Sequence, residues 1–476
     1  MTFAWKGRAG LNLPVPMPCN VLPASAAGCA AACARWDVDQ TVMMITPSTS
    51  VAWLYYPKAD HYVAATSWAF PIAPGAGSAL AWHPGGPTGT ASAGTTTTLT
   101  STTTTVRDLA GFKLRITGGP NAGEERTILH NTIGANAVFT VDTPFGTAIT
   151  NASVYQLRTG RWYALIPGTL ASGYFKSYDW ATDTLSSLTI TGLPATWAAA
   201  ESRLIPCYRK VPLVAARAVA SATGTTLTAT GTAWNTNKWA SSQVRIVTGT
   251  GAGQVRTIAS NTGTVLTVSA AWTVNPDGTS TFVVEPNEDF IFVLGNSAVT
   301  MYRYSISGNS FTTISPGVAR AAAFGAGGYG FLIDNQTNAL WTNEDTGLNG
   351  TKIYSPRGGA SAIVDVYDLI TNGWSALTVG VETFTTGSMW AEMSGSLYVQ
   401  KDATGRWFEF KAQEGKLRPF AFHGASYTQG AAILGNRSWA YEYVEDGVEV
   451  SIVYGWLNTS ATLVRIIDLN ASADVS

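Results

Sequence analysis

The sequence predicts an all-β protein, and three observations support that fold class. Apolar and polar residues alternate at a period of two in many short runs, while no stretch keeps a 3.6-residue period over even three turns. A β-module occurs twice, at residues 91–157 and 217–286. A two-strand aromatic unit recurs along the rest of the chain. Helix is expected only in two short pieces, near residues 24–35 and 197–204.

Residues 1–35 are expected to form an extended N-terminal arm. The prolines deny residues 1 to about 25 a ladder of their own hydrogen bonds, so this part of the arm is predicted to become ordered by docking on a neighbouring subunit or partner protein rather than on its own core. The Ala-rich piece 24–35 is predicted as a short helix. Cys29 and Cys33 would then share one face of it, but two thiols without a third ligand favour small-residue packing over a metal site.

The two modules match at a constant offset of 130 over their best-preserved part. Each copy follows the pattern strand, Gly turn, strand, Asn turn, strand, which predicts hairpins with one buried face. The module is therefore predicted to be a small β-domain. The matching residues are Arg126-Thr127-Ile128 with Arg256-Thr257-Ile258, and Asn131-Thr132 with Asn261-Thr262.

The Gly turn of the first module has the spacing of a phosphate-binding loop, from Gly118 to Gly123. Such a loop needs Lys and then Ser or Thr after the second glycine, whereas Glu124 and Glu125 follow here. The second module lacks the spacing. A hairpin connection is therefore favoured over nucleotide binding.

The aromatic unit consists of an aromatic strand, a polar turn and a second strand that opens with a bulky residue. It occurs at residues 53–62, 174–188, 301–314, 366–377, 407–420 and, more loosely, 439–453. It resembles the kelch-like β-propellers through Tyr178-Asp179, Tyr367-Asp368 with Trp374, and Gly327-Gly328. The resemblance implies a β-propeller formed by residues 36–90, 158–216 and 287–476, with an array of β-sandwiches as the alternative.

Composition excludes several partner classes. The chain of 476 residues has 29 basic and 30 acidic residues, and only 12% of its residues are charged. Without a basic cluster, sequence-specific nucleic-acid binding is not expected. No apolar run approaches the ~20 residues of a membrane span, so no membrane partner is expected. The first 20 residues lack the apolar core of a secretory signal, so no export is expected either.

The sequence predicts no enzyme, and no catalytic, cofactor-binding or metal site. The four histidines, His61, His83, His130 and His423, are scattered through different units, and no Gly-x-Ser-x-Gly motif is present. The densest carboxylates are Glu442, Glu445, Asp446 and Glu449, which alternate on a predicted hairpin and are expected in solvent.

The module phrase Arg-Ile, Gly, Ala-Gly, Arg-x-Ile, followed by an Asn turn, resembles short β-units of tailed-phage virion proteins. This resemblance implies a structural component of a phage particle, a multi-copy tail or neck protein that forms a ring with itself and with other virion proteins. The alternative is a host-surface or glycan-binding protein whose exposed aromatic rings stack on sugars. Low charge favours the first class, because obligate interfaces are more apolar than free surfaces.

The two modules bracket one segment of about the length of a propeller blade. They are therefore expected to project from consecutive blades on one face, with their bases close together, and to supply the subunit contacts.

Overall fold

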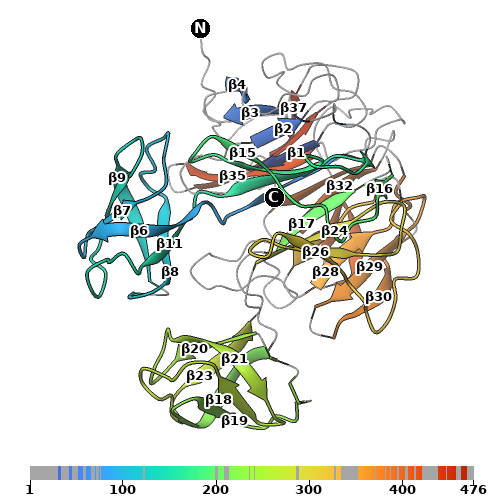
Figure 1. The fold of residues 1–476 in the computed structure, drawn as a ribbon. Coiled ribbons are helices and arrows are strands. Elements are labelled where there is room, and N and C mark those ends of the chain that lie inside the picture. The colour runs from blue at the N-terminus through green and yellow to red at the C-terminus, as the bar shows by residue number, and fades with distance from the viewer. Residues whose placement is uncertain are drawn as a thin grey trace.

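The computed structural model describes residues 30–33, 42–45, 52–56, 61–65, 70, 74, 77–121, 124–198, 202–207, 214–234, 236–237, 239–240, 242–285, 289–325, 328–333, 352–369, 371–380, 382–385, 388–393, 396–401, 406–411, 414–420, 438–445, 448–456 and 463–468. Strands β1 to β37 form its regular structure, and these residues contain no helix (Figure 1). Of the predicted N-terminal arm, only Ala30–Cys33 is described.

Six small antiparallel sheets follow one another along the described chain, five with four strands and one with three. The first three sheets are β1 (Ala30–Cys33), β2 (Val42–Ile45), β3 (Ala52–Tyr56), β4 (His61–Ala65); β5 (Ala79–His83), β12 (Arg161–Leu165), β14 (Phe175–Asp179), β15 (Thr184–Ser187); and β17 (Arg203–Cys207), β24 (Phe290–Leu294), β25 (Tyr302–Ser305), β26 (Ser310–Thr313). The next three are β27 (Phe331–Ile333), β28 (Lys352–Pro356), β29 (Ile363–Asp368), β30 (Gly373–Thr378); β31 (Met389–Met393), β32 (Ser396–Lys401), β33 (Arg406–Lys411), β34 (Lys416–Phe420); and β35 (Ser438–Glu445), β36 (Val448–Trp456), β37 (Leu463–Asp468). A short pair, β13 (Gly168–Thr169) and β16 (Thr196–Trp197), lies outside these sheets.

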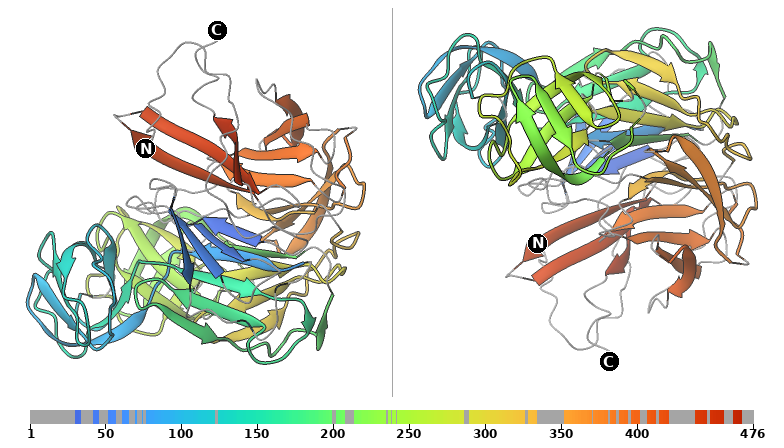
Figure 2. Two further views of the ribbon diagram at one scale, coloured as in Figure 1. Left: turned by 90° about the horizontal axis from the view of Figure 1, so that it is seen from above. Right: turned by 90° about the horizontal axis from the view of Figure 1, so that it is seen from below.

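The first strands of the sheets lie next to one another. β1 contacts β5, β5 contacts β17, β17 contacts β27, and β31 contacts β35, which returns to β1. Figure 2 shows the last sheet, in red, beside the first, in blue. This is a propeller-like arrangement. The predicted all-β, propeller-like fold with two inserted β-domains is confirmed.

Apolar layers hold successive sheets together. One cluster joins the first sheet to the second through Leu54 and Trp162. Tyr163, the next residue along β12, points the other way and packs with Tyr304 of the third sheet. Two further clusters join the third sheet to the fourth and the fourth to the fifth. Alternation along each strand thus places large residues on both faces of a sheet, as a propeller requires.

Neither predicted helical piece is helical where the structure describes it, and both contribute residues to strands. Ala30–Cys33 forms β1, which contacts β5 and β35, and residues 24–29 lie outside the described part. Small residues suit such an inner strand where sheets converge, and tertiary pairing outweighs the helix propensity of alanine. In the second piece, Trp197 belongs to β16, and its Nε1 donates to Ser202 Oγ at 2.8 Å. Leu204 is buried in β17, opposite Val293.

Five of the six aromatic units are the outer hairpins, made by the third and fourth strands, of the first five sheets. The sixth, 439–453, falls on the first two strands of the last sheet. In three consecutive sheets a tyrosine hydroxyl donates to a carbonyl or carboxylate oxygen five residues later, in a turn residue with positive φ. These pairs are Tyr178–Asp183 (2.6 Å, φ 49°), Tyr304–Asn309 (2.8 Å, φ 45°) and Tyr367–Asn372 (2.6 Å, φ 53°).

The fifth sheet shows what the tyrosine contributes. Phe410 stands in place of the tyrosine, and Gly415, with φ 61°, stands in place of the asparagine. Without a hydroxyl to fix a side chain in the turn, glycine is the residue that adopts this conformation at least cost. In these three sheets the tyrosine of the repeated aromatic unit therefore stabilises the turn of the outer hairpin.

The two modules are closed six-stranded barrels with the same strand order. Barrel 1 consists of β6 (Thr88–Gly94), β7 (Thr98–Ser101), β8 (Lys113–Gly118), β9 (Glu125–Asn131), β10 (Val138–Val141) and β11 (Val154–Leu157). Barrel 2 consists of β18 (Val214–Thr223), β19 (Thr226–Ala229), β20 (Gln243–Thr248), β21 (Val255–Asn261), β22 (Val265–Val268) and β23 (Thr281–Glu285). Each barrel is inserted between the first and second strands of its sheet, the second sheet for barrel 1 and the third for barrel 2.

The residues shared by the two modules hold equivalent places in the barrels. Asn131 Oδ1 accepts the backbone N–H of Leu109 at 2.6 Å, and Asn261 Oδ1 accepts that of Trp239 at 2.8 Å. The repeated arginine ties its strand to the following loop: Arg126 Nε donates to the Pro144 carbonyl. Arg256 Nε donates likewise to the carbonyl of Ala271. The repeated phrase therefore specifies the barrel itself rather than a ligand site.

Candidate functional site

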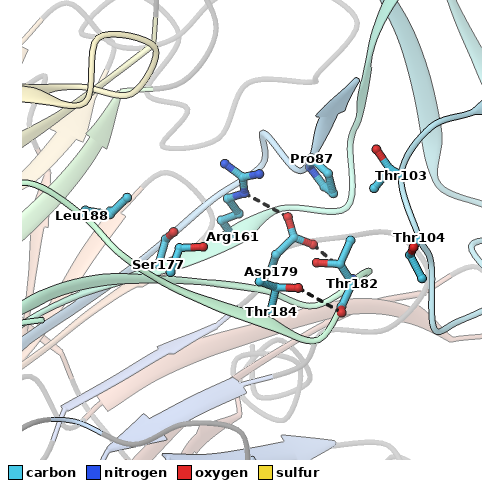
Figure 3. Close-up of a pocket in the computed structure, with 10 residues that line it drawn as sticks. Pro87, Thr103, Thr104, Arg161, Ser177, Asp179, Thr182, Thr184 and Leu188 are labelled. Atoms are coloured by element: carbon cyan, nitrogen blue, oxygen red, sulfur yellow. Dashed lines mark hydrogen bonds and ion pairs between the residues drawn. The ribbon is translucent and has the colours of Figure 1, made fainter. Parts of the chain in front are cut away.

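A pocket of about 400 Å³ lies between barrel 1 and the outer part of the second sheet (Figure 3). Its walls come from the linker into barrel 1, from the loop after β7, and from strands β12, β14 and β15. Most of the side chains carry a hydroxyl group or a charge, and the pocket contains no aromatic ring. Its lining residues are Pro87, Thr103, Thr104, Arg161, Ser177, Asp179, Thr182, Thr184, Ser186 and Leu188.

The charges in the pocket form one ion pair. Arg161 Nε donates to Asp179 Oδ2 at 2.9 Å, and the other oxygen, Oδ1, accepts the backbone N–H of Ala181 at 3.1 Å. Burial raises the pKa of Asp179, and Arg161 acts against that rise. Burial disfavours the Arg161 charge, yet Asp179 holds the pKa of the guanidinium above its ordinary value. Two opposite charges close together leave the pocket with no net charge.

Barrel 1 is docked beside this pocket on the turn of the β14–β15 hairpin. Arg107 Nε donates to the carbonyl of Trp180 at 2.9 Å, and the guanidinium lies 4.7 Å from the centroid of the same indole. The backbone N–H of Val106 donates to Ala181 at 3.1 Å, and Phe112 packs against Trp180. These contacts fix the two walls of the pocket relative to each other.

A second charged group lies where the chain leaves the sheets for the barrels. His83 ends β5, and its Nε2 lies 3.3 Å from Asp289 Oδ2, just before β24. The Nδ1 atom of His83 accepts the Gly85 N–H at 3.0 Å, so the proton of a neutral ring is on Nε2, facing the carboxylate. Burial would raise the pKa of Asp289, but His83, Arg158 and Arg115 together hold it below its ordinary value. Four segments distant in sequence thus meet at one junction.

The structure places the residues considered from sequence in separate parts of the molecule. The Gly118–Gly123 segment joins β8 to β9, which pair as an antiparallel hairpin, and residues 122–123 lie outside the described part. A carboxylate oxygen of Glu124 accepts from Arg126 at 2.5 Å, so this side chain serves the barrel. Glu442 and Glu445 lie on β35 and Glu449 on β36, with Asp446 in the undescribed connection.

The remaining candidates do not come together either. His61 lies on β4, His83 ends β5, and His130 lies on β9, while His423 is outside the described part. Within the described residues, no three His, Cys, Asp or Glu side chains gather as they would around a metal ion. Cys33 lies on β1, Cys207 is buried at the end of β17, and Cys19 and Cys29 are not described. The part of the chain that the structure describes also holds no helix of the length and hydropathy of a membrane span.

Sequence reasoning missed both the pocket and the junction. The sequence singles out Asp179 only as part of a Tyr-Asp pair on a predicted blade, and His83 only as one of four scattered histidines. The pocket draws residues from the incoming linker, a barrel loop and three strands, and no local pattern connects them. His83 and Asp289 are brought together only by the contact of β5 with the third sheet. Their one sequence signal is position, since each lies at a boundary between a sheet and a barrel.

No protein-family model matches the chain, and no curated protein sequence matches it. Among solved structures, a mitotic checkpoint complex chain aligns over 98% of both chains with a TM-score of 0.37 and 7% identity. An auxiliary nutrient binding protein from Bacteroides thetaiotaomicron aligns over 78% of this chain and 93% of its own, with a TM-score of 0.25 and 10% identity. The phage phi92 endosialidase aligns over 95% of this chain and 69% of its own, with a TM-score of 0.27 and 10% identity.

These scores carry no argument about function. The propeller-like arrangement with its two barrels is established by the strand order of the chain itself.

Proposed function

We propose that this protein is a non-enzymatic structural component of a tailed-phage particle, a tail or neck protein present in several copies in a ring. The observation that carries the proposal is the paired barrel. Its repeated phrase resembles modules of phage virion proteins, and both copies are inserted at the same point of consecutive sheets. In this role the protein works in the virion after assembly in the host cytoplasm. Its partners are other copies of itself and neighbouring virion proteins, with no membrane and no sequence-specific nucleic acid.

The barrels are the proposed contact elements. Both project outward from the group of sheets in Figure 1, and their closed strand order leaves no unpaired edge. Their outer surfaces are rich in threonine and carry isolated exposed apolar side chains. These are Val106, Leu129, Ile133 and Val154 on barrel 1, and Val247 and Val274 on barrel 2. Such a surface favours contacts through apolar area, hydroxyl groups and backbone over contacts through ion pairs.

The test replaces both barrels by short Gly-Ser links between β5 and β12 and between β17 and β24. Because the barrels are inserted between neighbouring strands of a hairpin, the sheets should still fold. The variant should run as a monomer in analytical ultracentrifugation and fail to enter rings or particles. Normal assembly of a folded variant would overturn the proposal.

Replacing one barrel at a time measures how much each barrel contributes to assembly. A variant without barrel 2 alone, and one without barrel 1 alone, should each assemble less well than the intact chain. Assembly should remain insensitive to moderate salt, since exposed ion pairs weaken with ionic strength and apolar contacts do not. A steep loss of assembly with added salt would argue for ion pairs and against this account.

A further inference from the structure

We propose that the pocket between barrel 1 and the second sheet binds a neutral saccharide. This inference goes beyond a role in assembly and does not depend on it, because it rests on the pocket alone. Its volume of about 400 Å³ is within the range of small-ligand sites.

The walls of the pocket are held in place before a ligand arrives. Barrel 1 is fixed to the β14–β15 turn by Arg107 and Val106, and Thr103 and Thr104 therefore keep their place opposite the sheet. Thr103 is further held because its hydroxyl accepts a hydrogen bond from Tyr155 at 2.9 Å. A preformed site loses little conformational entropy on binding, which removes one of the costs of association.

The ion pair excludes charged ligands. An anion needs an arginine whose charge is not already balanced, but Arg161 is paired with Asp179. A cation needs an available carboxylate, but Asp179 Oδ2 faces the guanidinium and Oδ1 accepts backbone N–H groups of Ala181 and Thr182. Of the Arg161 side chain, 29% is exposed, so its planar edge remains at the pocket wall without offering net charge.

Hydroxyl groups supply the recognition. Thr104, Ser177 and Ser186 line the pocket, and their hydroxyls make no hydrogen bond to another residue that the structure describes. A hydroxyl both donates and accepts, as does each hydroxyl of a sugar, so the two sets can pair in either direction. Leu188 and Pro87 provide the small apolar area against which the C–H face of a sugar ring can lie. An apolar ligand would bury these hydroxyls without partners, at a cost for each.

The experiment titrates the full-length protein with glucose, galactose and N-acetylglucosamine, and with N-acetylneuraminic acid as the anionic comparison. Binding is followed by saturation-transfer NMR and calorimetry. The site variant is Thr104→Val with Ser186→Ala, which removes two hydroxyls that make no internal hydrogen bond. The matched control is Thr312→Val, at the position of β26 that corresponds to Ser186 on β15. Ser177→Ala is a second site variant on a different strand.

At least one neutral sugar should bind saturably, and affinity should fall about fivefold for each hydroxyl removed, as for a typical neutral hydrogen bond. The Thr312→Val control should bind like the unaltered protein. The proposal is overturned if none of the three neutral sugars binds, if the site variants bind as tightly as the control, or if N-acetylneuraminic acid binds in preference to them. A failure of sugar binding would leave ring assembly unaffected, so the two proposals fail separately.

Discussion

Barrel 1 and barrel 2 share a strand order and a sequence phrase. They differ in the source of the side chains that complete the core, because barrel 2 supplies its own and barrel 1 takes one from the second sheet. Each barrel has one partly buried tryptophan packed against its core. In barrel 2 this is its own Trp234, which lies 6.2 Å from Trp239 and 6.4 Å from Phe282 between ring centroids. In barrel 1 it is Trp180, which belongs to the β14–β15 hairpin of the second sheet.

The charged residues at the base of each barrel, where it joins its sheet, also differ in whether their partners lie inside the barrel. In barrel 2, Arg245 donates from Nη2 to the buried Glu285 at 2.6 Å. The corresponding residues of barrel 1 are Arg115 and Arg158, which carry like charges. Burial lowers the pKa of Arg115 and Arg158 lowers it further, while Glu125, Asp289 and Glu285 oppose them. Two of those three acidic groups lie outside barrel 1.

A duplicated domain can therefore keep its fold while its dependence on the surroundings changes. Barrel 1 takes an indole and negative charge from outside itself, which ties it to the sheets and creates the pocket beside them. Barrel 2 takes neither, and the comparison predicts that it is the more independent unit. Four experiments test this difference.

The largest expected effect is on folding in isolation. A fragment of residues 214–285 should give a cooperative thermal transition, whereas a fragment of residues 88–157 should not. The reason is that a domain of this size is marginally stable and cannot lose a core side chain and its charge partners. Circular dichroism melting and the dispersion of amide NMR signals measure the outcome.

A longer fragment, residues 79–188, is the control for barrel 1. It restores Trp180 and the strands of the second sheet, so it should fold better than 88–157. If 88–157 folds as cooperatively as 214–285, the dependence inferred for barrel 1 is wrong.

The next largest difference between the two barrels is expected when the tryptophan packed against each core is replaced by alanine. Trp180→Ala should cost about 3 kcal/mol, at the low end for loss of a large core side chain because the indole is only partly buried. It should also release barrel 1 from the sheet, so that proteolysis between residues 84 and 88 speeds up. Trp234→Ala should destabilise barrel 2 by a similar amount without exposing that linker. Equal protease sensitivity in both variants would contradict the assignment of Trp180 as the docking residue.

The third difference concerns the charged residues at the base of each barrel and the stability lost when one of them is neutralised. Glu285→Gln should cost about 2 kcal/mol, because it leaves Arg245 without its carboxylate partner, although the 24% exposure of Arg245 lets water replace part of the loss. Arg158→Gln should cost less, since it weakens the attraction to Asp289 but also removes the repulsion of Arg115. Denaturant melts of the full chain measure both changes. A larger loss for Arg158→Gln would mean that the junction, rather than the barrel, dominates.

The same contrast shows what sequence could predict. The barrels and the outer hairpins were predictable because their determinants lie within one module or one hairpin. Asn131 accepts a hydrogen bond from Leu109 of its own barrel, and Tyr367 donates to Asn372 five residues later. The helix predicted at 24–35 failed at Ala30–Cys33 because pairing with β2 and contact with β5 decide that segment, and neither partner is near in sequence. The pocket could not be predicted for the same reason. Arg161 becomes a pocket residue only when barrel 1 docks on a turn that follows it in the chain.

The smallest expected effect is the pH dependence contributed by Asp142, a carboxylate that barrel 1 has and barrel 2 lacks at the corresponding position. Asp142 Oδ1 accepts the backbone N–H groups of Thr127 at 3.0 Å and Thr143 at 2.8 Å. Burial would raise the pKa of Asp142, but the hydrogen bonds from Thr127 and Thr143 together outweigh burial and hold the pKa below its ordinary value of 3.8. Barrel 2 has Ser269 at the corresponding position. Its backbone N–H donates to the Thr257 carbonyl at 2.8 Å, just as that of Asp142 donates to the Thr127 carbonyl at 2.9 Å.

Because the folded-state pKa is depressed, the carboxylate of Asp142 contributes stability at pH above 3.8, and this contribution is lost as the pH falls through the lowered value. Asp142→Ser should therefore lower stability near pH 7 by a few tenths of a kcal/mol, a small amount because the group is exposed and screened by solvent. The difference between the variant and the unaltered chain should vanish at strongly acidic pH. Ser269→Asp is the reciprocal variant and should introduce the same dependence in barrel 2. Thermal midpoints measured from pH 7 downward decide the matter, and a difference that persists unchanged in strong acid would show that Asp142 acts through its shape rather than its charge.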